Sequence, residues 1–143
     1  MVKRILATVD TGEHGEDIVP VVAALARGAG SAVRLLRVFP IPQRVVGTHG
    51  RTVAYVDQEM ARLTAEGLAD LRHVEADLGD VPVETVVRFG EVAEEIALEA
   101  EAFGADLIAL GGGRSGRLRS LVAPDVAERV ERSVEIPTLV LRG

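Results

Sequence analysis

The chain contains no cysteine, no tryptophan and a single lysine, Lys3, and only 3% of its residues are aromatic. Without cysteine there is neither a disulfide framework nor a thiolate metal site. So few aromatic side chains cannot supply the stacking platforms of a protein that binds single-stranded nucleic acid. The net charge of -6 points the same way, because phosphate backbones attract basic surfaces. We therefore expect no nucleic-acid partner.

Long apolar segments are also missing. No uninterrupted apolar run approaches membrane-spanning length, and no signal-like segment follows the N-terminal Met1. His14, His49 and His73 show no metal-ligand spacing, so we expect no metal site. No linker divides the 143 residues, which predicts one domain, residues 1–143. Together these absences predict a cytoplasmic protein without membrane contact.

What is present is an alternation of apolar runs with segments of helical periodicity. Strands are predicted at 3–9, 32–39, 81–89, 105–110 and 136–141, and helices at 18–29, 53–78, 92–103 and from 126 onward. Pro20 either lies in the first turn of its helix or bends it, and Pro137 indicates an edge strand or a strand start. This alternation predicts an α/β fold in which right-handed crossovers join a doubly wound parallel sheet with helices on both faces.

In such a sheet, ligands bind beyond the carboxyl ends of the strands, where the winding direction reverses. The loop after the first strand contains Asp10 and Thr11, and the apolar fourth strand runs into the glycine-rich segment 111–116. Asp10 is suited to accept hydrogen bonds from a ribose or base, the glycines allow close approach of a phosphate, and Arg114 can balance its charge. Alternatively, Asp10 caps the first helix, the glycines only form a tight loop and the arginine is solvated.

Catalytic signatures are weak. Residues 111–116 match G-x-G-x-x-G, but the dinucleotide fingerprint belongs after the first strand, not the fourth. No G-x-x-x-x-G-K-[ST] segment exists, which excludes a P-loop phosphotransferase. Ser115 and Ser120 have no base evident from the sequence. Enzymatic activity, at most slow ATP hydrolysis, is the least favoured class of function.

The segment before the last predicted helix disfavours a terminal phosphate. Asp125 and Glu128 have the spacing of a capping box, in which Asp125 accepts the first amides of the helix. A phosphate near that helix start would face a fixed carboxylate. At an effective dielectric of about 20, two like unit charges roughly 4 Å apart repel by about 4 kcal/mol. This is enough to remove most of a modest nucleotide affinity.

Six segments together resemble the universal stress protein family. They are KRILATVD from Lys3, GEVAEEI from Gly90, ADLI from Ala105, GRSG from Gly113, VAERV from Val126 and IPTLVL from Ile136. The resemblance spans nearly the whole chain. It implies a five-stranded parallel sheet ordered 3-2-1-4-5 and a homodimer formed through the last strand, here residues 136–142. Many members of the family bind ATP or AMP.

The resemblance also implies a nucleotide site. Asp10 and Val38 would meet the adenine and ribose, Gly111 the ribose, and Gly113 and Gly116 the phosphates. Nucleotide-binding members carry a glycine followed by serine or threonine where this chain has Pro124 and Asp125. Two interpretations therefore remain open. One is a stress-response module that binds adenine nucleotide weakly, and the other is a nucleotide-free protein of the same fold that acts through dimerisation and protein contacts.

Overall fold

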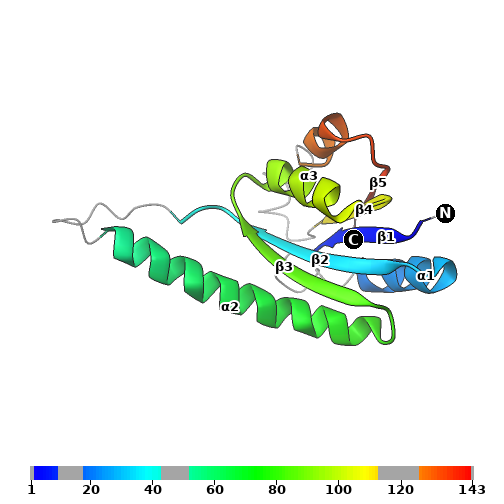
Figure 1. Ribbon diagram of the computed structural model, residues 1–143, viewed down its shortest axis with the longest axis horizontal. Helices are drawn as coiled ribbons and strands as arrows, with labels where there is room; N and C mark the ends of the chain where they lie inside the picture. Colours follow the sequence, from blue (N-terminus) through cyan, green and yellow to red (C-terminus); the bar gives the residue numbers. More distant parts are fainter. Residues whose placement is uncertain (1, 10–17, 43–51, 113–125, 143) are drawn as a thin grey trace.

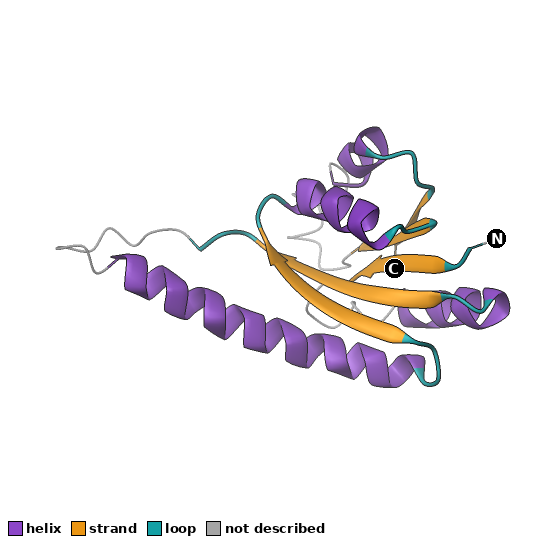
Figure 2. Ribbon diagram, in the orientation of Figure 1, coloured by secondary structure: helices purple, strands orange, loops and turns teal. Residues whose placement is uncertain are grey.

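The computed structural model describes residues 2–9, 18–42, 52–112 and 126–142 of the chain. Five strands form one sheet, and helices cover both of its faces (Figures 1 and 2). The strands are β1 (Arg4–Thr8), β2 (Ala32–Phe39), β3 (Val83–Phe89), β4 (Leu107–Gly112) and β5 (Thr138–Arg142). The helices are α1 (Val19–Ala29), α2 (Thr52–Leu78) and α3 (Val92–Phe103), and residues 126–133 form a further helix.

The strand order is β3-β2-β1-β4-β5, and every pair is parallel. This confirms the predicted fold class and strand order. The chain winds outward from β1 through β2 to β3, then returns to β4 on the other side of β1 and continues to β5. The direction of winding therefore reverses between β1 and β4, and this boundary is the switch point of the sheet.

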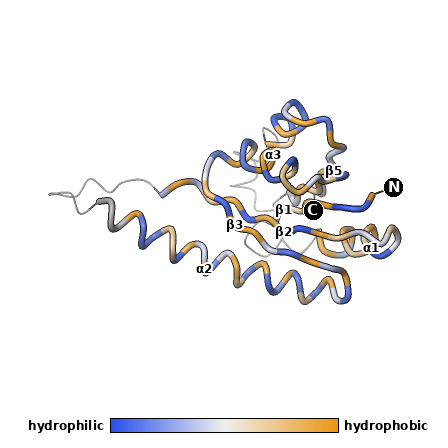
Figure 3. The backbone as a smooth tube through the Cα atoms, viewed as in Figure 1, coloured by the Kyte–Doolittle hydropathy of each residue, from blue (hydrophilic) through white to orange (hydrophobic). Residues whose placement is uncertain are grey.

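Two cores lie on the two faces of the sheet. Ile5 packs with α1 and α2, whereas its neighbour Leu6 packs with α3 and the helix at 126–133, and both are fully buried. Strand side chains alternate between the faces, so one apolar run supplies both cores. Full burial of each such side chain contributes about 1.5–3 kcal/mol. Figure 3 shows apolar residues recurring along the strands and at intervals along α2.

Most element boundaries agree with the sequence pattern. β2 has the predicted bounds, and α1 begins at Val19 with Pro20 in its first turn, the first of the two alternatives. β5 is an edge strand that begins directly after Pro137, as that proline indicated. β3 begins two residues later than predicted, at Val83, because Pro82 has no N–H group to donate to a strand ladder.

The fourth strand is displaced by two residues from its predicted bounds, from 105–110 to Leu107–Gly112. Gly111 and Gly112 were expected in the glycine-rich loop, but they belong to β4 and pair with Leu141 and Arg142 of β5. Glycine disfavours strands in isolation, but here pairing with a neighbouring strand holds the backbone extended. The strand therefore includes the first two residues of the predicted loop.

Gly67 lets α2 approach the sheet closely. A Cβ atom at Gly67 would lie 2.9 Å from a ring carbon of Phe39 and 3.1 Å from a methyl of Val87. Phe39 in turn stacks on Phe89, with ring centroids 5.7 Å apart. Only glycine fits between the helix and this aromatic pair, so Gly67 fixes the position of α2 over β2 and β3.

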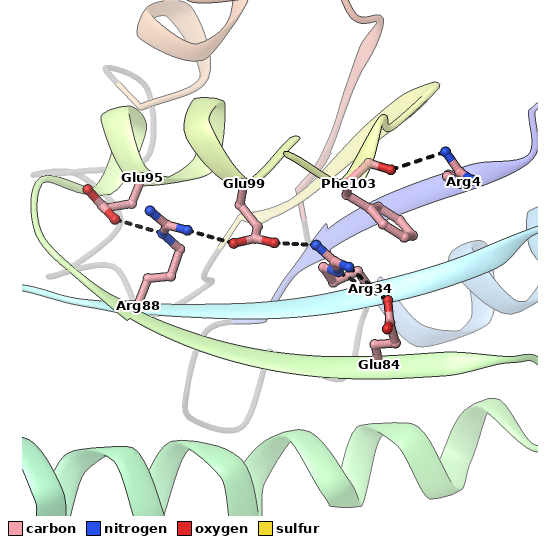
Figure 4. A network of polar contacts seen from close by, with 7 residues as sticks. All are labelled: Arg4, Arg34, Glu84, Arg88, Glu95, Glu99 and Phe103. Carbon is pink, nitrogen blue, oxygen red and sulfur yellow. Dashed lines mark hydrogen bonds and ion pairs between the residues drawn. The ribbon is translucent and has the colours of Figure 1, made fainter. Parts of the chain in front are cut away.

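Polar contacts fix α3 on the opposite face (Figure 4). Glu99 of α3, whose side chain is 5% exposed, accepts hydrogen bonds from Arg34 of β2 (2.5 Å) and Arg88 of β3 (2.8 Å). Arg34 also donates to Glu84, and Arg88 also donates to Glu95. We call these five residues the ion-pair ladder. It ties α3 to the half of the sheet formed by β2 and β3.

The ion-pair ladder raises the pKa of both of its arginines. Burial acts to lower the pKa of Arg34, but hydrogen bonds with Glu84 and Glu99 outweigh it and the pKa is raised. The hydrogen bond with Glu95, followed by that with Glu99, raises the pKa of Arg88. Both guanidinium groups are therefore charged at neutral pH.

A second carboxylate holds the start of β1. Asp106 accepts hydrogen bonds from the backbone amides of Lys3 (2.8 Å) and Arg4 (2.9 Å). These bonds, the one from Lys3 being the larger cause, lower the pKa of Asp106. The turn before β4 is thereby fastened to the beginning of the central strand.

None of the helices in the described ranges combines the length and apolar character needed to cross a membrane. The predicted cytoplasmic location remains a prediction.

Candidate functional site

The candidate site lies at the carboxyl end of β1, where the neighbouring strands extend further than β1 does. The register of β1 ends at Thr8, which pairs with Leu36 of β2 and Leu110 of β4. β2 continues to Phe39, and β4 continues to Gly112. The end of β1 is therefore recessed between two longer strands. We call this place the switch-point edge and define it by Thr8, Val38 and Gly111.

Val38 brings backbone polar groups to one side of the switch-point edge. The N–H of Val9 donates to the carbonyl of Leu36 (2.9 Å), so this carbonyl turns toward β1. The N–H and C=O groups of alternate strand residues point the same way, and those of Val38 therefore also turn toward β1, beyond its last paired residue. The half-buried Val38 side chain packs on the core under α3. It is therefore the backbone of Val38, not its side chain, that can meet a ligand.

Gly111 forms the other side. A Cβ atom there would lie 3.4 Å from the carbonyl oxygen of Thr8 and 3.7 Å from Ile18 at the start of α1, which are ordinary contact distances. Packing thus tolerates a methyl group at this position. Because Gly111 carries no methyl group, a ligand can approach the backbone of β4 closely beside the end of β1.

Arg37 adds a positive charge that the sequence analysis missed. Its guanidinium lies 4.5 Å from the ring centroid of Phe39, and its Nη1 donates to the carbonyl of Val9 at 3.5 Å. Its side chain is only half-exposed. An arginine inside a mostly apolar strand was the only signal, and by itself such a residue is as compatible with a solvated edge as with a site.

The described helix starts near this edge differ in their capping. α3 is capped by Glu91, which accepts a hydrogen bond from the amide of Glu94 (2.7 Å) and pairs with Arg129 of the last helix. At the start of α1, the N-cap Ile18 makes no side-chain capping bond. The side chain of Ile18 therefore does not bond the first backbone amides of α1.

Six of the predicted site residues lie outside the described residues. They are Asp10, Thr11, Gly113, Arg114, Gly116 and Asp125. Val38 and Gly111 are described, and the fold places them on opposite sides of the end of β1. In the ranges that the structure describes, no three His, Cys, Asp or Glu residues are grouped so as to hold a metal ion.

Comparison with solved structures identifies close architectural relatives. A protein described as hypothetical protein MJ0577 is 25% identical, with a TM-score of 0.81 over 100% of this chain and 97% of its own. A universal stress protein in complex with cAMP is 14% identical (TM-score 0.65, 99% of this chain and 97% of that one). The universal stress protein of Archaeoglobus fulgidus in complex with dAMP is 17% identical (TM-score 0.59, 99% and 100%).

No curated protein sequence matches the chain. The universal stress protein family, however, matches residues 1–142, nearly the full length. The strand order, the position of the switch point and this match agree with one another. The chain belongs to the universal stress protein family.

Proposed function

We propose that this protein is a stress-response module that binds adenine nucleotide, ATP or AMP, weakly at the switch-point edge. The observation that carries the proposal is the recess at the end of β1, with the backbone of Val38 on one side and Gly111 on the other. The ligands of two structural neighbours, cAMP and dAMP, are consistent with this ligand class.

The base is the part of the ligand that Val38 can recognise. An adenine edge carries an amino donor beside a ring-nitrogen acceptor, and a backbone C=O and N–H complement this pair. These groups of Val38 turn toward the recess. Asp10 is proposed to contribute a carboxylate to the adenine and ribose, with Thr11 beside it.

The sugar and phosphates would extend toward β4. Gly111 allows the ribose to approach the strand backbone, and Gly113, Arg114 and Gly116 are proposed to contact the phosphates. The positive charge of Arg37 favours an anionic ligand at the same edge. Chemistry on the nucleotide is not part of the proposal, because the sequence shows no evident base and nucleophile pair and the described residues contain no group of acidic, His or Cys residues suited to a metal ion.

Asp125 is proposed to make the site selective among AMP, ADP and ATP. A carboxylate at a helix start repels a terminal phosphate, so affinity is expected to fall from AMP to ADP to ATP. Calorimetric titration of the parent protein with the three nucleotides measures this order. Asp125→Ser keeps a competent helix cap but removes the charge, and should raise affinity for ATP more than for AMP, with a gain that shrinks in added salt.

Asp80→Ser is the matched control, because Asp80 is a highly exposed aspartate that pairs with Arg27 at the turn before β3. It should leave all three affinities unchanged. Equal affinity for ATP and AMP in both the parent and Asp125→Ser would contradict the role of Asp125. If neither protein binds any of the three nucleotides, the result favours the nucleotide-free alternative, in which the chain acts through dimerisation and protein contacts.

We also propose that the protein forms a homodimer through residues 136–142. β5 is an edge strand, paired within the described residues with β4 alone. Its outer backbone groups are suited to pair with the same strand of a second copy. Such a pairing extends the sheet across the dimer.

A further inference from the structure

The opposite edge of the sheet, β3, is also open in the described part of the chain, where it pairs with β2 alone. β3 has seven residues, none of them buried and none of them proline. Natural edge strands are commonly short, interrupted by proline or covered, because an open edge attracts another strand. Within the described residues, β3 uses none of these three protections. Its charged side chains must therefore either block pairing or direct it.

Hydrogen bonds at the two ends of β3 define which backbone groups face outward. The N–H of Val33 donates to the carbonyl of Pro82 (2.8 Å), and the N–H of Gly90 donates to the carbonyl of Phe39 (3.0 Å). Even-numbered residues of β3 therefore turn their backbone groups toward β2. The outward N–H and C=O groups belong to the odd-numbered residues Val83, Thr85, Val87 and Phe89.

These outward groups match those of an antiparallel copy of the same strand. With a two-fold axis at Val86, Val83 lies opposite Phe89 and Thr85 opposite Val87, and both pairs can exchange two backbone hydrogen bonds. The even-numbered residues then form the closer, non-hydrogen-bonded pairs. All seven residues of the strand take part in this register.

The same register pairs opposite charges. Glu84 and Arg88 lie on the face of β3 that carries α3, equally far from Val86 along the strand. About the two-fold axis, Glu84 of each copy lies opposite Arg88 of the other. A slip of two residues in either direction places neither charge opposite its complement. The charges therefore favour one register of this strand with itself.

The ion-pair ladder leaves atoms that suit this contact. Arg34 bonds Glu84 through two nitrogens, Nε and Nη2, and both donate to Oε1 of Glu84. Arg88 uses Nε for Glu95 and Nη1 for Glu99. Oε2 of Glu84, whose side chain is 63% exposed, and Nη2 of Arg88 are thus the atoms that can meet across the axis.

We infer that β3 is a self-complementary interaction surface that pairs antiparallel with β3 of a second copy of this chain about a two-fold axis at Val86. This surface is distinct from the β5 edge proposed above, because the two strands lie at opposite ends of the sheet. Two such interfaces on one chain generate assemblies larger than a dimer.

A designed cysteine tests the register directly. Val86→Cys places two thiols in a non-hydrogen-bonded pair on the axis, where Cβ atoms lie about 4.5–5.5 Å apart, near the reach of a disulfide. The chain has no other cysteine to interfere. Val83→Cys is the matched control, also a half-buried valine of β3, because its copies would lie far apart.

Under mild oxidation, Val86→Cys should form a covalent dimer on a non-reducing gel, at least about tenfold more than Val83→Cys. No covalent dimer of Val86→Cys, or equal amounts from both variants, would overturn the inference. Both are mild substitutions, and the melting temperature of each confirms that it is folded.

Charge reversal is the second measurement, by sedimentation velocity over a concentration series. Glu84→Arg places like charges opposite each other across the axis and should lower the average mass. Glu128→Arg, which reverses another exposed and ion-paired glutamate, should leave the mass unchanged. A parent protein that stays monomeric, or a mass unaffected by Glu84→Arg in a folded protein, would refute the β3 interface.

Discussion

At the scale of single residues, a substitution of Gly111 can distinguish a role in ligand binding from a role in packing. A methyl group there meets Thr8 and Ile18 only at ordinary contact distance. Gly111→Ala should therefore change the free energy of unfolding by less than about 1 kcal/mol. It should weaken AMP binding about tenfold, because the methyl group occupies the approach to β4. Urea unfolding and calorimetric titration measure the two effects.

Gly28→Ala is the control for that substitution. Gly28 lies inside α1, and a Cβ atom there meets nothing within 4 Å. Alanine should stabilise the helix by about 0.4–1 kcal/mol and leave AMP binding unchanged. Unaltered AMP affinity in Gly111→Ala would move the ligand away from the switch-point edge.

Asp106 makes a prediction about acid stability. Its pKa is lowered in the folded protein, chiefly by the hydrogen bond from the amide of Lys3. Its contribution is therefore present above its unfolded pKa of about 3.9 and is lost as the pH falls through the lower folded pKa. Asp106→Asn should be less stable than the parent at pH 7, and the difference should shrink below about pH 4.

Urea unfolding at several pH values checks this prediction. Asp77→Asn, an exposed aspartate on α2, serves as the control and should change stability little at any pH. A difference between Asp106→Asn and the parent that is equal at pH 7 and pH 3 would show that the carboxylate charge does not matter.

The residue scale is also where sequence reasoning reached its limit. The mostly apolar run of β2 and its ending before Pro40 defined that strand correctly. By contrast, Gly111 was read as loop, because glycine carries no side chain to reveal a strand period. Arg37 was missed because its contact with Val9 comes from the pairing of two strands, which the local pattern does not contain.

At the scale of elements, the ion-pair ladder attaches α3 to the sheet. Arg34 and Glu99 are 65 positions apart in the chain, so no local pattern could predict their contact. Glu99 is buried between two arginines, and neutralising it leaves both without their shared carboxylate. Glu99→Gln should therefore destabilise the protein by about 1–3 kcal/mol. Replacing the buried part of the ladder as a whole, Arg34, Arg88, Glu95 and Glu99, by apolar residues should cost less than this, because no buried charge is left unpaired.

Urea denaturation of these variants measures the difference, with Glu101→Gln as the control. Glu101 is an exposed glutamate on the same helix, and its loss should change stability by less than about 0.5 kcal/mol. Equal effects of Glu99→Gln and Glu101→Gln would show that the ladder contributes nothing to the attachment of α3.

At the scale of the whole molecule, the proposed β5 dimer depends on outward backbone groups of the last strand. The amide of Ile108 donates to the carbonyl of Pro137, so Val140 turns its own N–H away from β4. Val140→Pro removes an outward donor but no bond to β4. Light scattering should show a dissociation constant raised at least about tenfold, or monomer.

Thr138→Ser is the control for the proline, because it keeps every backbone donor of β5 and the side-chain hydroxyl that donates to Ile136. It should leave the dissociation constant unchanged. If Val140→Pro folds and dimerises as tightly as the parent, the dimer does not use this strand. Crosslinking through Val86→Cys would then test the opposite edge alone.

The fold itself was the most predictable level. Alternating apolar runs and helical periods specify a parallel sheet covered on both faces, and the family resemblance supplied the strand order. The candidate site was less predictable, because the recess at the end of β1 arises from the relative lengths of three strands. Strand ends depend on which neighbours they pair with, and those neighbours are distant in sequence.

The central position of β1 has a consequence for synthesis on the ribosome. Arg4 and Asp106, which fasten β1 to the turn before β4, are 102 positions apart. At about 5–20 residues per second, roughly 5–20 s pass between their translation. During that interval β1 can pair with β2 but has no β4 beside it. The nascent chain therefore carries an unpaired apolar strand edge until β4 has been synthesised.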